Sequence, residues 1–450
     1  MNALEIAEWA LDHVSEEGEV VVGTERSGFA RYAGSEVHQP TLVENASVQL
    51  RLVRDGREAI ATTNRTDDEG LAGLAARAAE VLASASEDPD LPPLAPPASF
   101  PEIEGYDEET AALGAEDQSR LAAAAIAAAA DFDLYGYFTS GVCELAIAAT
   151  TGLRGSQRTT DAACLALAAG EDASGYALAT AWRAGEIDPA AVAHEAAEKA
   201  ARTRGAQSAE PARYRAVLEP YAIAELLYWF SFDTFNGLGL LEERSFFAGR
   251  IGEHAFDPKV TLVDDALDPQ GLPAAFDFEG TPKQRVPLVE DGVVRGPVWD
   301  RTTAARAGRE STGHALPADS RDFGALASAV SMAPGDAESV GELAELVGDG
   351  IYVTRLHYLS VVNPREGVLT GMTRDGTFRI RGGKVAEPLV NLRFTVSMAD
   401  LLGDVLGLTR ETRLVNQSDF YDDRWAYGYR VPAIATGSFN VTGAGSSPGL

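Results

Sequence analysis

Hydrophobic residues at helical spacing open the chain. Apolar side chains recur every three or four positions from Leu4 to Val14, and Gly18 follows, so the pattern predicts a helix within residues 2–17. Alternation of apolar and polar positions then predicts four strands, over residues 19–24, 28–32, 47–54 and 57–63. Asp55-Gly56 between the last two strands indicates a tight hairpin, and Asp67 is placed to cap a helix that ends near Ser84. We expect residues 1–85 to form an N-terminal α+β domain.

A proline-rich stretch follows this unit. Residues 86–101 contain six prolines, which favours an extended linker. An Ala-rich helix is predicted over residues 116–130, and alternating small, polar and apolar residues with Gly-bearing turns predict a meander of strands after it. A second helix is expected from Pro189 to about Arg204, with Gly205 at its end. Residues 102–207 are therefore expected to form a middle domain.

The remainder of the chain is rich in strand signals. From residue 212 onward β-type stretches alternate with turns, and only residues 221–232 and 397–406 show helical spacing. No repeat of 20 to 50 residues is found, which argues against solenoids and propellers. We expect a large β-rich C-terminal domain over residues 212–450. The predicted fold class is α+β, with mixed β-sheets and flanking helices.

Charge narrows the possible partners. The 450 residues include 37 Lys and Arg against 68 Asp and Glu, a net charge of −31 that disfavours direct contact with nucleic acid. Such a surface, with only four lysines, is typical of a salt-rich cytosol. Two cysteines cannot form a disulfide framework, and no stretch approaches 18 uninterrupted apolar residues. We expect a cytoplasmic protein without a membrane partner.

One local pattern has the spacing of metal ligands. His194 and Glu198 stand four positions apart on a predicted helix with Glu195 beside the first, as in an HExxH peptidase motif whose second histidine is replaced by glutamate. A solvated helix explains the same residues, and we favour that interpretation, so no metal or catalytic residue is assigned. No two of the six histidines lie within one helical turn. Acidic residues in turn-rich segments leave a cation site assembled by the fold open: Asp264, Asp265, Asp277 and Glu279.

Aromatic residues concentrate in the C-terminal region. Seven rings fall within the 20 residues from Tyr228 to Phe247, and such a stripe forms either a core or an apolar surface for a peptide or a partner. No GxGxxG, GxxxxGK[ST] or GxSxG motif is present. The candidates for a peptide-binding or interface surface are Tyr228, Trp229, Phe232 and Phe235.

Several segments resemble the TldD/PmbA family, a group of metallopeptidases once described as modulators of DNA gyrase. The resemblance lies in residues 47–71 and 245–294 and in the short runs 311–315, 371–385 and 391–397. In that family the TldD-type subunit has an HExxxH zinc motif on a helix early in the C-terminal domain and uses a cysteine near its C-terminus, and the TldE (PmbA) type lacks the zinc motif. The corresponding stretch here, residues 218–237, contains Glu225 but no histidine, and no cysteine follows Cys164. Both departures indicate the TldE type.

The resemblance implies a function for the whole chain. A TldE-type protein is expected to be the non-catalytic subunit of a zinc metallopeptidase that acts on unfolded peptides, with zinc in a TldD-type partner and no cofactor in this chain. The assembly is expected to be a heterodimer or a homodimer. Two alternatives remain open: a stand-alone metallopeptidase with unconventional ligands, and a homodimeric module that binds peptides or proteins.

Overall fold

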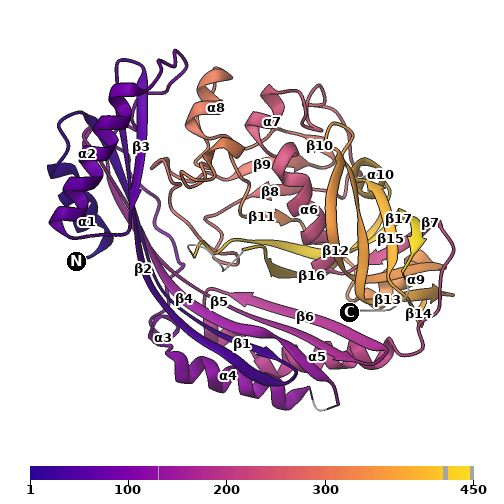
Figure 1. Ribbon diagram of the computed structural model, residues 1–450. Helices are drawn as coiled ribbons and strands as arrows, with labels where there is room; N and C mark the ends of the chain where they lie inside the picture. Colours follow the sequence, from indigo (N-terminus) through magenta and orange to yellow (C-terminus); the bar gives the residue numbers. More distant parts are fainter. Residues whose placement is uncertain (130, 419–423, 446–450) are drawn as a thin grey trace.

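Two β-sheets form the framework of the protein (Figure 1). The computed structural model describes residues 1–129, 131–418 and 424–445. The first sheet has six antiparallel strands in the order β3-β2-β1-β4-β5-β6. These strands are β1 (Glu17–Ala33), β2 (Glu36–Arg54), β3 (Arg57–Thr63), β4 (Asp133–Ala149), β5 (Arg154–Gly170) and β6 (Ala173–Ala181).

The pairing of β1 with β4 makes the first sheet continuous across the proline-rich stretch. It runs from Glu19 opposite Ala149 to Tyr32 opposite Gly136. The segments 1–85 and 102–207 therefore share one sheet, and their division into separate domains stays a prediction. Residues 19–24 and 28–32 also belong to one strand rather than two, because strands on both sides pair with the polar residues between them.

Local signals in the N-terminal region are confirmed. Asp55 and Gly56 both have positive φ angles, 50° and 71°, which are the signs of a type I′ hairpin turn. The Asp67 side chain accepts a hydrogen bond from the Gly70 amide at the start of α2. The helices attached to this sheet are α1 (Ala3–Asp12), α2 (Asp68–Ser84), α3 (Glu108–Ala112), α4 (Ala115–Ala128), the 3₁₀ turn η1 (Ala184–Glu186) and α5 (Pro189–Arg202).

The two faces of the first sheet have different neighbours. In β1, β2, β4 and β5 the fully buried residues that pack beneath the helices are even-numbered, such as Val22, Leu50, Phe138 and Cys164. Side chains alternate along a strand, so the odd-numbered positions face the opposite way. On that opposite side lies the C-terminal domain, whereas α4 covers the helical side (Figure 1).

The second sheet builds the C-terminal domain and mixes parallel with antiparallel pairs. The strand β7 lies parallel to β12 and β11 lies parallel to β17, while the other pairs are antiparallel. Its strands are β7 (Ala212–Leu218), β8 (Leu262–Asp264), β9 (Val286–Glu290), β10 (Val293–Val294), β11 (Val330–Met332), β12 (Gly350–Asn363), β13 (Val368–Arg381), β14 (Lys384–Leu389), β15 (Leu392–Ser397), β16 (Val405–Asn416) and β17 (Gly428–Ala444). The expected α+β class with mixed sheets is confirmed.

Short helices surround this second sheet. The longest, α6, has a mostly buried face that packs into the main hydrophobic core together with residues of β12 and β17. None of the helices within the described residues has the length and apolar character needed to cross a lipid bilayer. The helices are α6 (Pro220–Thr234), α7 (Gly237–Leu241), α8 (Arg301–Arg306), the 3₁₀ turn η2 (Arg321–Phe323), α9 (Val340–Val347) and α10 (Met398–Gly403).

Candidate functional site

A cavity of about 910 Å³ lies between the first sheet and the C-terminal domain. Its size is near the upper end of the range for ligand-binding clefts. One wall is the face of the first sheet that the helices leave uncovered, and most of its residues occupy odd-numbered positions. These residues are Val21, Gly23, Glu25 and Ser27 of β1, Val43, Asn45, Ser47 and Gln49 of β2, Cys143 and Leu145 of β4, and Gln157, Thr159 and Asp161 of β5.

The opposite wall of the cavity is rich in aromatic rings. Phe278 and Trp425 meet edge to face with ring centres 5.3 Å apart, and Trp425 lies 4.8 Å from Tyr427. Phe232 of α6 lines the same cavity, as does Phe323, whose side chain is 67% exposed. Aromatic rings beside polar strand positions suit a ligand with both apolar and hydrogen-bonding groups, as a peptide has.

An ion pair connects the two walls. Arg424 donates two hydrogen bonds to Asp161 of β5, one from Nε at 2.8 Å and one from Nη2 at 2.6 Å. Both side chains are almost fully buried. Burial opposes the charge of the guanidinium, but the Asp161 carboxylate outweighs it and raises the pKa of Arg424. The pair holds the aromatic segment 424–427 against the sheet.

A buried charged group lies next to the cavity in the C-terminal domain. Asp264 accepts hydrogen bonds from His314 Nε2 at 2.7 Å and from the Ala329 amide at 2.9 Å. Burial and the nearby Lys283 charge lower the pKa of His314, so its imidazole is neutral. A neutral ring that donates from Nε2 accepts at Nδ1, where the Thr312 hydroxyl lies 2.9 Å away.

Asp277, on the cavity lining, organises the loop beside this group. Its carboxylate accepts hydrogen bonds from three backbone amides, those of Glu279, Thr281 and Ala315, at 2.8 to 3.0 Å. Glu279 accepts a bond from the Arg301 amide, and burial together with the negative charges of Asp277 and Asp300 raises its pKa to about 8. Asp265 accepts a hydrogen bond from the Leu267 amide at 3.1 Å and lies 3.5 Å from Arg285. The four acids considered for a cation site thus have partners from the protein itself.

The residues with metal-ligand spacing do not converge. His194 and Glu198 are both 67% exposed and face one another at 3.3 Å. Glu195 turns away from them and pairs with Lys199 at 2.8 Å and with Arg413 at 3.0 Å. Within residues 1–129, 131–418 and 424–445, no three His, Cys, Asp or Glu side chains form a group suited to a metal ion.

The four aromatic residues predicted to form a peptide-binding or interface surface do not all lie on one side of α6. Tyr228, Trp229 and Phe232 are half-buried on one face of α6, and the hydroxyl of Tyr228 lies 3.3 Å from that of Tyr427. Phe235 is fully buried, with its ring centre 5.6 Å from that of Phe247. Phe235 therefore belongs to the core, and of the other three Phe232 lines the cavity.

The same face of α6 does not fit a zinc ion. Its two acids already have partners: Trp229 Nε1 donates to the Glu225 carboxyl at 3.1 Å, and Asp233 pairs with Arg244. Burial raises the pKa of Glu225, which favours the protonated form that ligates metals poorly. The helix supplies no imidazole, the ligand that catalytic zinc sites use most.

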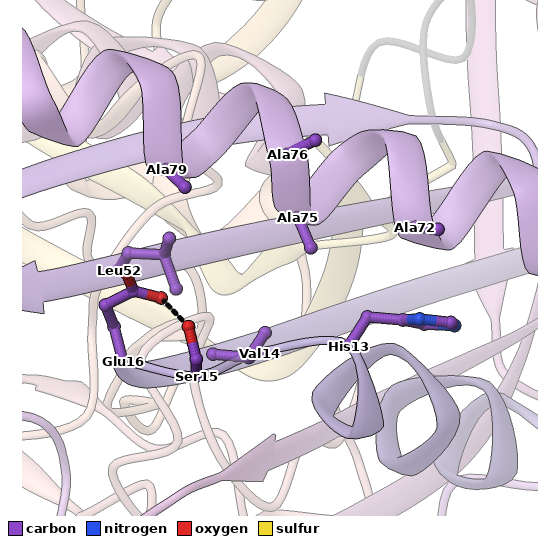
Figure 2. Close-up of a pocket in the computed structure, with 9 residues that line it drawn as sticks. All are labelled: His13, Val14, Ser15, Glu16, Leu52, Ala72, Ala75, Ala76 and Ala79. Atoms are coloured by element: carbon purple, nitrogen blue, oxygen red, sulfur yellow. Dashed lines mark hydrogen bonds between the residues drawn. The ribbon is translucent and has the colours of Figure 1, made fainter.

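A second, smaller hollow of about 250 Å³ lies between the end of α1 and the helix α2 (Figure 2). Alanines of α2 and the segment from His13 to Glu16 line it, and Ser15 donates a hydrogen bond to Glu16 at 2.8 Å. Its volume is less than a third of that of the large cavity. The large cavity is the better candidate site.

Sequence reasoning named the aromatic helix but missed most of the cavity. The strand residues that line it come from four strands, and no local motif marks them. Lys283 and Arg424, the two basic residues of the lining, were also missed. The rarity of lysine in this chain was the one signal that could have drawn attention to Lys283.

The family models account for most of the chain. Residues 211–443 match the PmbA/TldA metallopeptidase C-terminal domain, and residues 18–82 match the PmbA/TldA metallopeptidase domain 1. The first of these matches alone spans more than half of the 450 residues. The chain belongs to the PmbA/TldD metallopeptidase family. The absence of histidine from α6 is therefore a feature of a member of this family.

Curated relatives of the family match over part of their length. A metalloprotease of Methanothermobacter thermautotrophicus is 28% identical over 218 residues, which are 48% of this chain and 47% of that protein. A zinc metalloprotease TldD homolog of Saccharolobus solfataricus is 29% identical over 129 residues, 28% of each chain. The matched regions thus span less than half the length of these relatives.

Solved structures match over nearly the whole chain. TldE from Thermococcus kodakarensis superimposes with a TM-score of 0.86 at 20% identity, over 98% of this chain and 99% of that one. A proposed modulator of a DNA gyrase from Thermotoga maritima gives a TM-score of 0.83 at 18% identity, over 97% and 99%. These similarities establish a shared fold.

Proposed function

We propose that this protein is a TldE-type, non-catalytic subunit of a TldD/TldE-type zinc metallopeptidase that acts on unfolded peptides in the cytoplasm. The observation that carries the proposal is the cavity between the first sheet and the aromatic wall. Its volume of about 910 Å³ and its mixed lining suit a short stretch of extended polypeptide. Family membership supplies the link to proteolysis.

A free strand edge beside the cavity supports peptide as the ligand. The strand β3 pairs only with residues 48–54 of β2, so residues 36–47 have β1 on one side and no strand on the other within the described chain. Val43, Asn45 and Ser47 of this stretch line the cavity. An extended peptide can add its backbone hydrogen bonds to such an edge while its side chains enter the cavity.

The composition of α6 supports a zinc site in a partner subunit rather than in this chain. Its half-buried face presents Tyr228, Trp229 and Phe232 beside a carboxyl that is already hydrogen-bonded, and these groups bind apolar side chains rather than metal. We assign the hydrolytic step to a TldD-type partner subunit. In this chain the same face packs against peptide or contributes to the cavity wall.

The test uses the purified chain in high salt, alone and mixed with a TldD-type subunit of the same organism. Zinc content and cleavage of an unfolded peptide are measured for each sample. We expect cleavage only in the mixture. One zinc per chain with chelator-sensitive cleavage by this chain alone would establish a stand-alone peptidase. A homodimer that binds peptide with the same affinity in the presence and absence of the TldD-type subunit would establish a binding module.

Substitutions connect the activity to the cavity. Phe232→Ala removes a ring from the cavity wall, and we expect about tenfold weaker peptide binding because aromatic residues dominate such contacts. Tyr358→Ala is the matched control, since Tyr358 is 79% exposed and is not part of the cavity lining. Equal effects of the two substitutions would contradict the placement of the peptide in this cavity.

A further inference from the structure

Lys283 is a basic residue of the cavity lining, and its amino group has no hydrogen-bond acceptor within the described residues. It lines the cavity and is only 7% exposed. Its backbone amide bonds to the Ala275 carbonyl at 2.9 Å, which fixes the start of its side chain. In the described residues, no acceptor lies within hydrogen-bond distance of Nζ, and no carboxylate oxygen lies within 4 Å.

The two nearest carboxylates cannot serve as that acceptor in their present arrangement. Asp264 and Asp277 oppose the loss of charge that burial imposes on Lys283, so both lie close enough to act on it electrostatically. Asp264 is already bonded to His314 and to the Ala329 amide, and Asp277 to three amides. Burial outweighs their attraction and lowers the pKa of Lys283, and neither carboxylate accepts a hydrogen bond from its amino group.

An unmatched buried ammonium is costly, and the cavity is the side from which an acceptor can reach it. Ser328 adds a second donor there. It lines the same cavity, is 6% exposed, and its hydroxyl has no protein partner within the described part of the chain. Ser328 precedes Ala329, whose amide binds Asp264, so it lies in the same neighbourhood as Lys283.

The rest of the cavity lining disfavours anions. Glu144 and Asp319 line it and form no ion pair within the described residues, whereas Glu25 accepts a hydrogen bond from the Arg424 amide and Asp161 is neutralised by the Arg424 guanidinium. A ligand with many negative charges would be repelled by this lining. A ligand with one carboxylate is accommodated if that group lies at Lys283. The charge distribution therefore defines one position for one negative group.

We propose that Lys283 and Ser328 form a subsite that binds a single carboxylate of the peptide in the cavity. The carboxylate is either the C-terminal group of the peptide or the side chain of an aspartate or glutamate. This inference rests on the proposed function, because it assigns the charge of the peptide that the cavity accepts. It also predicts a preference for peptides with a carboxylate at this position, which the aromatic wall by itself does not provide.

The experiment compares four versions of one unfolded peptide on the full-length chain. One pair differs only at its end, a free C-terminal carboxylate against an amide, and the other only at an internal glutamate against glutamine. Affinity is measured by fluorescence anisotropy. We expect one carboxylate version to bind about tenfold more tightly than its uncharged counterpart, as expected for a hydrogen bond between charged groups. The pair that shows the difference identifies the source of the carboxylate.

Variants assign the preference to Lys283. Lys283→Met keeps the length of the side chain and removes its charge, so we expect the preference to disappear while the uncharged peptides still bind. Lys384→Met is the matched control, because Lys384 is exposed at the start of β14 and is absent from the cavity lining. Equal binding of charged and uncharged peptides to the unmodified protein overturns the proposal, and so does a preference that survives in Lys283→Met.

A second measurement needs neither a variant nor peptide binding. Lys283 is acylated with an amine-directed reagent, and its modification is followed by mass spectrometry with and without N-acetylglycine, which carries a C-terminal carboxylate alone. Slower modification of Lys283, with Lys384 unchanged, supports the subsite, and an unchanged rate overturns it. If none of the four peptides binds, the proposed function fails, and this protection experiment decides the carboxylate subsite separately.

Discussion

Arg424 and Asp161 are 263 residues apart in the chain, yet their side chains form a two-bond ion pair with donor to acceptor distances of 2.8 and 2.6 Å. Asp161 lies in the middle of β5, and Arg424 precedes the aromatic residues Trp425 and Tyr427 of the cavity wall. The pair therefore sets the spacing between the sheet and the C-terminal domain, and with it the width of the cavity.

Removal of the acidic partner tests this contact. We expect Asp161→Ala to lower the free energy of unfolding by about 3–5 kcal/mol, because it leaves a buried guanidinium without its counter-charge. Denaturant unfolding measures the change. The exposed pair of Arg410 with Glu338 is the control, and Glu338→Ala should cost less than about 1 kcal/mol. Similar losses in the two variants would show that the buried pair does not hold the walls together.

The pH dependence of stability tests the environment of Glu279. Its pKa of about 8 in the folded protein lies above the ordinary value, mainly because burial disfavours the carboxylate. Between about pH 4.5 and about pH 8 the folded state holds a proton that the unfolded state releases. The contribution of Glu279 to stability is therefore present at low pH and is lost as the pH rises through this window, by at most about 1.4 kcal/mol per pH unit.

Glu279→Gln should remove that contribution to the pH slope, because the amide keeps the shape of the neutral acid and does not titrate. The measurement is the free energy of unfolding at about pH 5 and about pH 8 for both proteins. Glu290→Gln, at a half-exposed surface position, should retain the slope of the unmodified protein. Parallel pH profiles for Glu279→Gln and the unmodified protein would refute the raised pKa.

A close approach between β6 and α5 predicts sensitivity at Gly175. A Cβ atom on this glycine would lie 2.1 Å from the Ala196 carbonyl oxygen and 2.3 Å from the Ala200 amide nitrogen. Gly175→Ala must displace the helix, and we expect a loss of about 1–3 kcal/mol, the usual cost of overpacking. Thermal unfolding measures it. Gly185→Ala meets nothing within 4 Å and serves as the control, so an equally destabilised control would point to a general loss of backbone freedom.

Periodicity and turn chemistry in the sequence were enough to predict the local elements. The hairpin at Asp55-Gly56, the cap at Asp67 and the helix that begins at Pro189 all follow from interactions between residues a few positions apart. Short segments of the sequence, such as residues 47–71 and 245–294, also identified the family. Such local patterns and motifs can be recognised without knowledge of the fold, because they do not depend on distant residues.

Long-range packing decided the site. No periodicity could show that β1 pairs with β4, or that Phe232 faces the cavity while Phe235 enters the core three positions later. Lys283 and Arg424 acquired their roles only because the fold placed buried carboxylates beside them. The sequence alone determined the turns, caps and main helices that depend on neighbouring residues and which family the chain resembles, but it missed helices such as α9 (Val340–Val347). The tertiary structure decided which faces meet, because burial and electrostatic compensation depend on partners that lie hundreds of residues away.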